Sequence, residues 1–174
     1  MSEPKILFIG AGAIGASVAA WVAESYKPVW IMGRGDAQDA LRKDGITIYD
    51  FAAPAATRRT VRIPTIARPG ELGDADIVVL GVKNYGLEAV ANQVRDELGD
   101  RPIIVSMANG IDNQRILPKL FSKVIYCVVV HNARRDVPPL GKAARRRLPA
   151  TVRRFPGEVG PLAPLLCGLR LRLI

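Results

Sequence analysis

Six consecutive residues near the N-terminus carry the clearest chemical signal, because their glycines follow the spacing G-x-G-x-x-G. Where a strand turns into a helix, the first glycine permits the tight turn and the second lets a pyrophosphate approach the backbone. The third allows the helix to pack on the sheet, and the helix N-terminus offers free N–H groups to phosphate. The predicted phosphate-binding residues are Gly10, Ala11, Gly12, Ala13, Ile14 and Gly15.

The surroundings of this loop decide how much weight it carries, because glycine-rich turns are common. The apolar run Lys5–Ile9 precedes it and is typical of a buried parallel strand. After it, apolar residues recur with helical spacing through Val22. A strand, the loop and a helix in this order form the context that a dinucleotide-binding motif requires. A purely structural turn remains the alternative.

The end of the second expected strand, Val29–Met32, bears on which dinucleotide binds. Domains that bind NAD usually place an acidic residue there to accept hydrogen bonds from the ribose 2′-hydroxyl. This sequence has Arg34 instead, and a guanidinium matches a 2′-phosphate in charge and geometry. Asp36 is the competing acidic residue, but we expect it to cap a helix over Ala37–Lys43. Arg34 therefore favours NADP(H), and a solvated surface arginine is the alternative.

Further strands and helices are expected to alternate along the chain. Gly45 and Gly99 are expected to end two of the helices, and Pro118 should interrupt or restart another. This alternation predicts an α/β fold of the Rossmann type, a doubly wound parallel sheet with helices on both faces. The further expected strands are 46–51, 61–66, 76–82, 102–107 and 124–130, and the further helices are 87–98 and 112–121.

Charge divides the chain into two parts. The formal net charge of +9 is concentrated near the C-terminus. Residues 1–136 hold 17 Lys and Arg against 15 Asp and Glu, whereas residues 137–174 hold 8 basic residues and one acidic residue. We expect a nucleotide-binding domain over residues 1–136 and a basic tail rich in Pro, Arg and Leu, without regular structure, over 137–174.

Two explanations compete for this tail. It could be an arm that places Arg145-Arg146-Arg147 and Arg153-Arg154 on nucleic-acid phosphates. It lacks interleaved aromatic residues and any recognisable binding module. Translation of a G+C-rich gene in a shifted frame explains the composition better, so a nucleic-acid partner is not favoured.

Several classes of protein are disfavoured by what the sequence lacks. No apolar run approaches the ~20 residues of a membrane span, and the first residues do not have the pattern of a secretory signal. Two cysteines form neither a disulfide framework nor a metal site. We expect a cytoplasmic protein without a metal, in which Cys127 is a buried packing residue and not a nucleophile.

An ordered set of short motifs resembles one family. The set comprises the glycine loop, Gly-Arg-Gly at 33–35 with Ala-Leu-Arg at 40–42, Val82-Lys83, Asn109-Gly110 and His-Asn-Ala-Arg-Arg-Asp at 131–136. Together these motifs resemble ketopantoate reductases (2-dehydropantoate 2-reductases) over residues 5 to about 136. The resemblance implies hydride transfer from NADPH to a small 2-oxo acid such as 2-dehydropantoate.

The resemblance also implies roles for individual residues. Lys83 would lie near the nicotinamide ribose, Asn109 would contact both cofactor and substrate, and Ala133 would line the cofactor through its backbone. Lys83 and Asn109 each follow an expected strand, at the end where open α/β sheets bind ligands. The alternatives are a solvated lysine and a simple Asn-Gly turn. We assign no catalytic role to His131.

The sequence also departs from the family pattern. Gly86 and Ala108 replace residues that are usually polar in the family. A helical second domain supplies the family's proton-donating lysine and a substrate-binding glutamate, and this sequence ends where that domain is expected to begin. Catalytic residues are therefore not assigned, and we expect self-association because the cofactor cleft would lack its cover. We expect NADPH binding with little turnover; a non-catalytic NADP-binding module and a nucleic-acid-associated protein are the alternatives.

Overall fold

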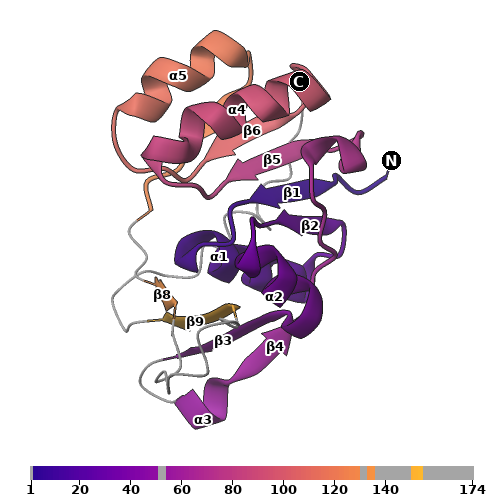
Figure 1. Ribbon diagram of the computed structural model, residues 1–174, viewed down its shortest axis with the longest axis vertical. Coiled ribbons are helices and arrows are strands. Elements are labelled where there is room, and N and C mark those ends of the chain that lie inside the picture. Colours follow the sequence, from indigo (N-terminus) through magenta and orange to yellow (C-terminus); the bar gives the residue numbers. More distant parts are fainter. Residues whose placement is uncertain (1, 51–53, 130–132, 136–149, 155–174) are drawn as a thin grey trace.

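A five-stranded parallel sheet forms the centre of the molecule (Figure 1). The computed structural model describes residues 2–50, 54–129, 133–135 and 150–154. The strand order β2-β1-β5-β6-β7 confirms the predicted doubly wound α/β fold. The strands are β1 Ile6–Ile9, β2 Val29–Met32, β5 Ile77–Leu80, β6 Ile103–Ser106 and β7 Val124–Tyr126.

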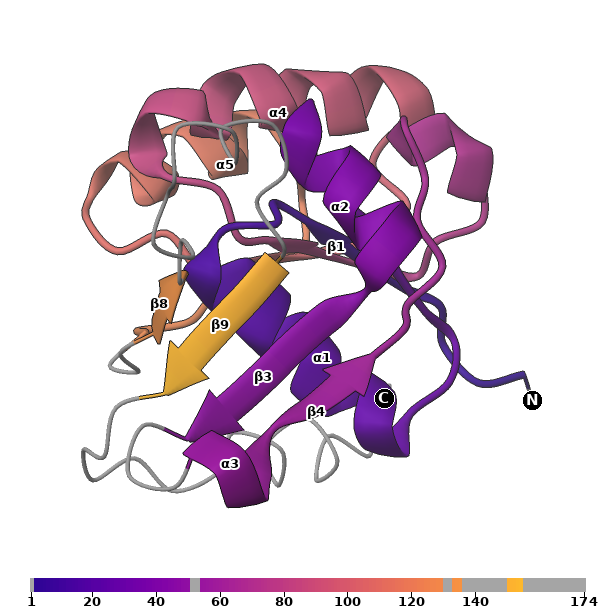
Figure 2. The same ribbon diagram turned by 60° about the horizontal axis from the view of Figure 1, so that its bottom comes forward.

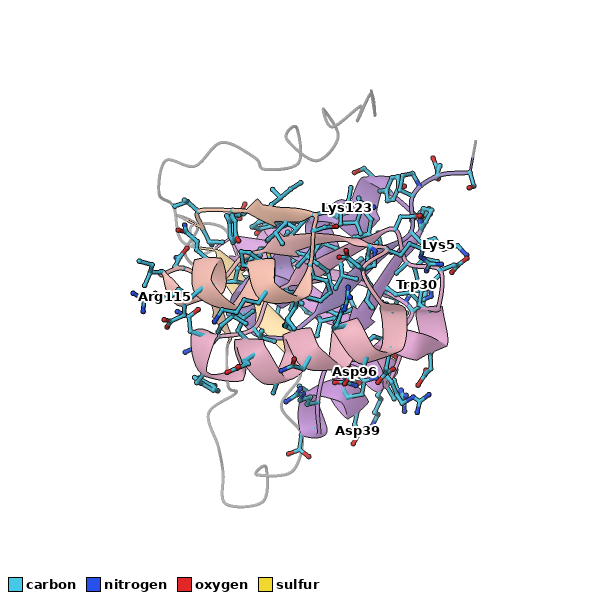
Figure 3. The ribbon with its side chains drawn as sticks, turned by 90° about the horizontal axis from the view of Figure 1, so that it is seen from above. Lys5, Trp30, Asp39, Asp96, Arg115 and Lys123 are labelled. Atoms are coloured by element: carbon cyan, nitrogen blue, oxygen red, sulfur yellow. The ribbon has the colours of Figure 1, made fainter. Side chains whose placement is uncertain are left out.

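Helices cover both faces of this sheet, because successive strand side chains point to opposite faces. Phe8 of β1 packs into a core with α1, whereas Leu7 and Ile9 pack into a second core with α4. Figure 3 shows α4 beside α5, with the exposed side chains Asp96 and Arg115 on their outer surface. No helix in the described ranges is long and apolar enough to cross a membrane. The helices are α1 Ala13–Ser25, α2 Asp36–Asp44, α4 Asn84–Leu98 and α5 Asp112–Leu120, with a short 3₁₀ helix at Pro69–Leu72.

A second sheet covers the outer side of α1 (Figure 2). Its strand order is β4-β3-β9-β8, and the short helix α3, Pro54–Thr57, connects β3 to β4. Ile46 and Ile48 of β3 extend the α1 core into this sheet. The strands are β3 Ile46–Asp50, β4 Arg59–Val61, β8 Ala133–Arg135 and β9 Ala150–Arg154.

Strand β9 corrects the expectation that the whole tail is irregular. It pairs in parallel with β3 over five residues, from Ala150 opposite Ile46 to Arg154 opposite Asp50, and antiparallel with β8. The tail lacks an apolar pattern, but strand pairing satisfies backbone N–H and C=O groups and does not require one. The remainder of 137–174, including Arg145-Arg146-Arg147, lies outside the described residues.

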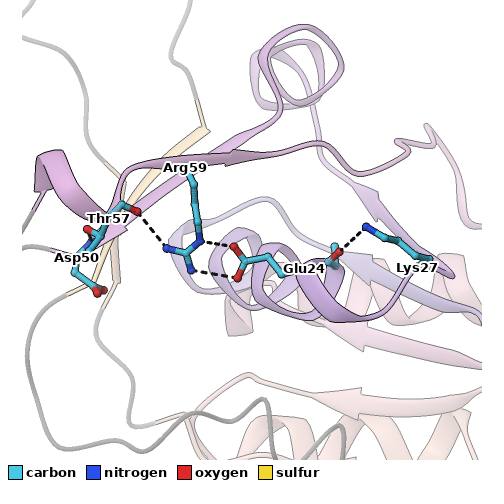
Figure 4. A network of polar contacts seen from close by, with 6 residues as sticks. Glu24, Lys27, Asp50, Thr57 and Arg59 are labelled. Carbon is cyan, nitrogen blue, oxygen red and sulfur yellow. Dashed lines mark hydrogen bonds and ion pairs between the residues drawn. The ribbon is translucent and has the colours of Figure 1, made fainter.

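A polar network attaches the second sheet to α1 (Figure 4). The Arg59 guanidinium donates to both carboxylate oxygens of Glu24 on α1, at 3.1 Å from Nη2 to Oε2 and through Nε to Oε1. Its Nη1 donates to the Thr57 carbonyl at 3.2 Å. The two parallel bonds of this fork fix the direction of β4 relative to the helix.

The expected strands 61–66 and 124–130 depart most from the structure. The expected strand 61–66 is divided: β4 ends at Val61, and a separate stretch beside β2 includes Thr65, which forms a bridge with Ile31. The expected strand 124–130 ends at Tyr126 as β7. Both runs are apolar enough for strands, but the neighbouring strand limits how far each can pair.

The helix ends confirm two predictions from the sequence and contradict two others. Gly45 and Gly99 follow α2 and α4 with φ of +73° and +69°, which confirms both as terminating glycines. The expected cap at Asp36 is wrong: Gly35 is the N-cap, and Asp36 begins α2 without a side-chain capping bond. The expected interruption at Pro118 is also wrong, since α5 continues to Leu120. Pro118 lies in the last turn, where little of the helix remains to be disrupted.

Candidate nucleotide-binding site

Parallel strands place their carboxyl ends along one edge of the sheet. The strand order reverses at β1: β2 lies on one side of β1, and the later strands β5, β6 and β7 lie on the other side. Backbone bonds continue the ladder past the strand ends: the Gly10 N–H donates to the Met32 carbonyl at 2.9 Å and the Gly81 N–H to the Ile9 carbonyl at 2.8 Å. Open α/β sheets bind ligands at such a reversal point.

Three glycines make close contact at this point. Gly10 has φ of +112°, a conformation that L side chains rarely adopt. A Cβ on Gly15 would lie 2.0 Å from the Gly10 carbonyl oxygen, and a Cβ on Gly81 would lie 2.9 Å from the Gly15 Cα. The first and third glycines of the motif are therefore required by packing, as expected. Sequence reasoning missed Gly81, whose signal was a glycine directly after a buried strand.

Gly12 differs from these three. It is exposed, it is the N-cap of α1 with an ordinary φ of −71°, and a Cβ there would meet no atom within 4 Å. The N–H groups in the first turn of a helix have no intrahelical partner and carry partial positive charge. No acidic residue lies in the first turn of α1. This arrangement can accept a phosphate directly against the backbone.

Arg34 lies in the turn between β2 and α2, at the same edge of the sheet. It is exposed, and its guanidinium has no hydrogen bond or ion pair among the described residues. Asp36 is also exposed, two residues further along. Both residues therefore remain available to a ribose, and their opposite charges predict opposite cofactor preferences.

Lys83 is the N-cap of α4 and is exposed at the carboxyl end of β5, where the sequence placed it. The next residue, Asn84, donates from Nδ2 to the Asn109 carbonyl at 2.9 Å. This bond joins the segments that follow β5 and β6. Sequence reasoning missed Asn84, which has no periodic or motif signal.

The Asn109 side chain is already engaged within the protein. Its Nδ2 donates to the Val129 carbonyl at 3.0 Å, and its Oδ1 accepts from the Val129 N–H at 3.1 Å. The amide thus ties the segment after β6 to the segment after β7. One N–H and one lone pair remain on it, so contact with a ligand stays a prediction.

Gly110 and Asn113 shape the rest of this loop. Gly110 has φ of +115°, and a Cβ there would lie 2.8 Å from Asn84 Nδ2. The buried Asn113 donates from Nδ2 to the Ala108 carbonyl at 2.5 Å. The loop that carries Asn109 is held on both sides by asparagine amides, which sequence reasoning did not identify.

Three other residues singled out by the sequence are Ala133, His131 and Cys127. Ala133 begins β8 in the second sheet and packs against the α1 core, so the parallel sheet itself does not bring it to the glycine loop. His131 lies outside the described residues. Cys127 is partly buried, and burial raises the pKa of its thiol, which disfavours the nucleophilic thiolate. This agrees with the predicted packing role.

Comparisons with known proteins identify a family. The sequence matches the family described as ketopantoate reductase PanE/ApbA over residues 6–144. It is 30% identical over 130 residues to 2-dehydropantoate 2-reductase of Pyrococcus horikoshii, a match that covers 74% of this chain and 40% of that protein. The corresponding enzyme of Archaeoglobus fulgidus is 29% identical over 133 residues, covering 76% of this chain and 42% of the relative.

Solved structures show the same fold. A PanE/ApbA family ketopantoate reductase from Ralstonia eutropha superposes with a TM-score of 0.70 at 22% identity, covering 86% of this chain and 46% of that one. D-mandelate dehydrogenase, solved with NADH and anilino(oxo)acetate, gives a TM-score of 0.68 at 18% identity, covering 88% and 46%. The chain therefore spans less than half the length of these relatives.

Proposed function

The chain belongs to the ketopantoate reductase PanE/ApbA family, and we propose on this basis that it binds NADPH as the nucleotide-binding part of a cytoplasmic 2-oxo acid reductase. The observation that carries the proposal is the contrast among the motif glycines. Gly10 and Gly15 are closed in by backbone, whereas the space beside Gly12 at the N-terminus of α1 is open. A pyrophosphate approaching the backbone needs this combination.

The residues at the carboxyl edge have distinct roles in this proposal. The glycine loop, Gly10–Gly15, holds the pyrophosphate, and Arg34 pairs with the ribose 2′-phosphate. Lys83 and Asn109 follow β5 and β6 and face the nicotinamide half. Ala133 contributes through its backbone, as the family resemblance implies. NADPH, when bound, supplies the hydride for reduction of a ketone.

The proposed substrate is a small 2-oxo acid. The P. horikoshii and A. fulgidus relatives are named for their action on 2-dehydropantoate. In this chain Asn109 is the proposed substrate contact, with one N–H and one lone pair left by its bonds to Val129. The positive charge of Lys83 at the same edge would attract the substrate carboxylate.

A fluorescence titration with NADPH and NADH tests the choice of cofactor. A charged hydrogen bond to the 2′-phosphate contributes about 1.5–3 kcal/mol, or roughly ten- to hundredfold in affinity. NADPH should therefore bind more tightly than NADH by that factor, and Arg34→Ala should remove most of the difference. Asp36→Asn is the matched control: it removes a nearby negative charge, so NADPH affinity should rise or stay unchanged.

Each failure has a separate meaning. Equal affinities of the unaltered chain for the two dinucleotides would contradict the NADP assignment. Weaker NADH binding in Asp36→Asn would make Asp36 the ribose ligand and this an NAD domain. Failure to bind either dinucleotide would contradict the proposed function itself.

A further inference from the structure

Gln38 is a buried polar residue of α2, with 8% of its surface exposed. Its Oε1 accepts a hydrogen bond from the Gly33 N–H at 2.6 Å, and its Nε2 donates to the Ile66 carbonyl at 2.7 Å. Both ends of the amide are therefore used, and both partners are backbone groups. A buried amide bonded at both its oxygen and its nitrogen is expensive to disturb, because a lost bond leaves a buried polar group unsatisfied.

The backbone of Gln38 holds the same turn from its other end. Its N–H donates to the Gly35 carbonyl at 2.9 Å. The two residues on either side of Arg34 are thus bonded by a single residue, one through its side chain and one through its main chain. Gly35 has φ of +52°, so this turn has a backbone conformation that glycine adopts readily.

The bond from Gln38 Nε2 to the Ile66 carbonyl connects this turn to the sheet. Ile66, which accepts from Gln38, donates its own N–H to the Ile31 carbonyl at 3.2 Å. Ile31 in turn donates to the Pro64 carbonyl at 3.0 Å. Gln38 therefore connects the turn that carries Arg34 to the central sheet through the 64–66 segment beside β2.

We propose that Gln38 is a specificity-determining positioning residue, which fixes the Gly33–Gly35 turn so that Arg34 meets the 2′-phosphate. The inference rests on the proposed function, because it takes Arg34 as the 2′-phosphate ligand. A bidentate guanidinium–phosphate contact requires a fixed orientation, and a looser turn would lose entropy on binding. The proposed pyrophosphate site lies at the N-terminus of α1, outside this turn, so we expect the effect to be confined to the difference between NADPH and NADH.

Two substitutions separate the bonds. Gln38→Met has similar size but makes neither side-chain bond, whereas Gln38→Glu keeps an acceptor for the Gly33 N–H and loses the donor to Ile66. In Gln38→Met the ratio of NADH Kd to NADPH Kd should fall at least about threefold, since a lost 0.7 kcal/mol corresponds to roughly that factor. The Kd for NADH should stay unchanged. In Gln38→Glu the ratio of NADH Kd to NADPH Kd should fall by less than in Gln38→Met, because one of the two side-chain bonds is kept.

A double-mutant cycle with Arg34→Ala gives a readout that a merely structural role would not produce. In the Arg34→Ala background, Gln38→Met should leave the ratio of the two Kd values unchanged. If Arg34→Ala by itself leaves the ratio unchanged, the assignment of Arg34 in the proposed function is wrong.

If Arg34→Ala lowers the ratio but Gln38→Met does not, only the inference about Gln38 is wrong. Equal weakening of NADPH and NADH binding by Gln38→Met would also overturn it, by showing a general structural role. Should Gln38→Met fail to fold, Gln38→Glu decides through the same cycle: it must lower the ratio with NADH binding preserved, and leave the ratio unchanged in the Arg34→Ala background. An unchanged ratio, or an equal fall in both backgrounds from repulsion by the new carboxylate, would reject the inference.

Discussion

Gly12 and Gly81 both lack side chains, but for opposite reasons. The space beside Gly12 is open, so glycine there matters only if a ligand approaches. The space beside Gly81 is filled by Gly15, so glycine there matters for folding. At the scale of single residues, function and stability can therefore be separated by substitution.

Gly12→Val should abolish dinucleotide binding while leaving the far-ultraviolet circular dichroism spectrum largely intact, because the added side chain enters the space for pyrophosphate. Gly81→Ala should instead destabilise the fold by about 1–3 kcal/mol, as expected for overpacking, measured by urea unfolding. Gly86→Ala is the control, since a Cβ there meets no atom within 4 Å. It should leave both binding and folding intact. Retained binding in Gly12→Val would mean that the loop is only a structural turn.

At the scale of elements, the second sheet depends on a strand from the basic tail. β9 lies between β3 and β8, so its backbone pairs on both sides. α1 is therefore packed between two sheets, one parallel and one mixed. Thr151 and Val152 are residue types that favour strands, but the basic tail around them has no apolar pattern that predicts one.

Val152→Pro tests whether this strand forms. Proline removes a backbone N–H and is tolerated poorly inside a sheet. The melting temperature should fall by several degrees, because about 1 kcal/mol shifts it by roughly 2–8 °C in domains of this size range. Val152→Thr, which keeps the N–H and a β-branched side chain, should melt close to the unaltered chain. Identical melting of all three proteins would show that the tail does not stabilise the fold.

At the scale of the whole molecule, the carboxyl edge of the parallel sheet exposes large apolar side chains. Tyr85, Ile111 and Val128 follow β5, β6 and β7, and their exposed fractions are 92%, 60% and 79%. The described part of the chain leaves these side chains to solvent beside the proposed cofactor site. Catalysis at such a site gains from excluding water and from orienting the substrate.

The chain by itself is expected to bind NADPH but to reduce 2-dehydropantoate at well below ~1 s⁻¹, the lower range of typical enzymes. It spans 40% of the length of the P. horikoshii relative, and a positioned proton donor contributes ~10²–10⁴-fold to rate. Steady-state assays with NADPH and several 2-oxo acids measure this, and a parallel NADPH titration confirms that the same sample binds cofactor. Turnover above that rate would show that the residues present complete a working site.

The local part of this protein could be predicted from its sequence. The glycine loop, the first helix and the parallel class of the sheet all follow from patterns within short windows, where neighbouring residues determine the backbone conformation. The placement of Lys83 and Asn109 at one edge also followed, because parallel strands align their carboxyl ends.

Only the tertiary structure revealed the contacts that hold this site together. Gly81 lies against Gly15, Gln38 reaches Ile66, and β9 pairs with β3. Each contact joins segments far apart in the chain, and the pattern of one segment does not say which segment will lie beside it. Strand β9 pairs with β3 through backbone hydrogen bonds, which are almost independent of side-chain type. Gly81 packs on Gly15 because neither has a side chain, and Gln38 bonds Ile66 through its amide. A basic tail could therefore supply a strand, and a single buried glutamine could hold the turn that carries Arg34.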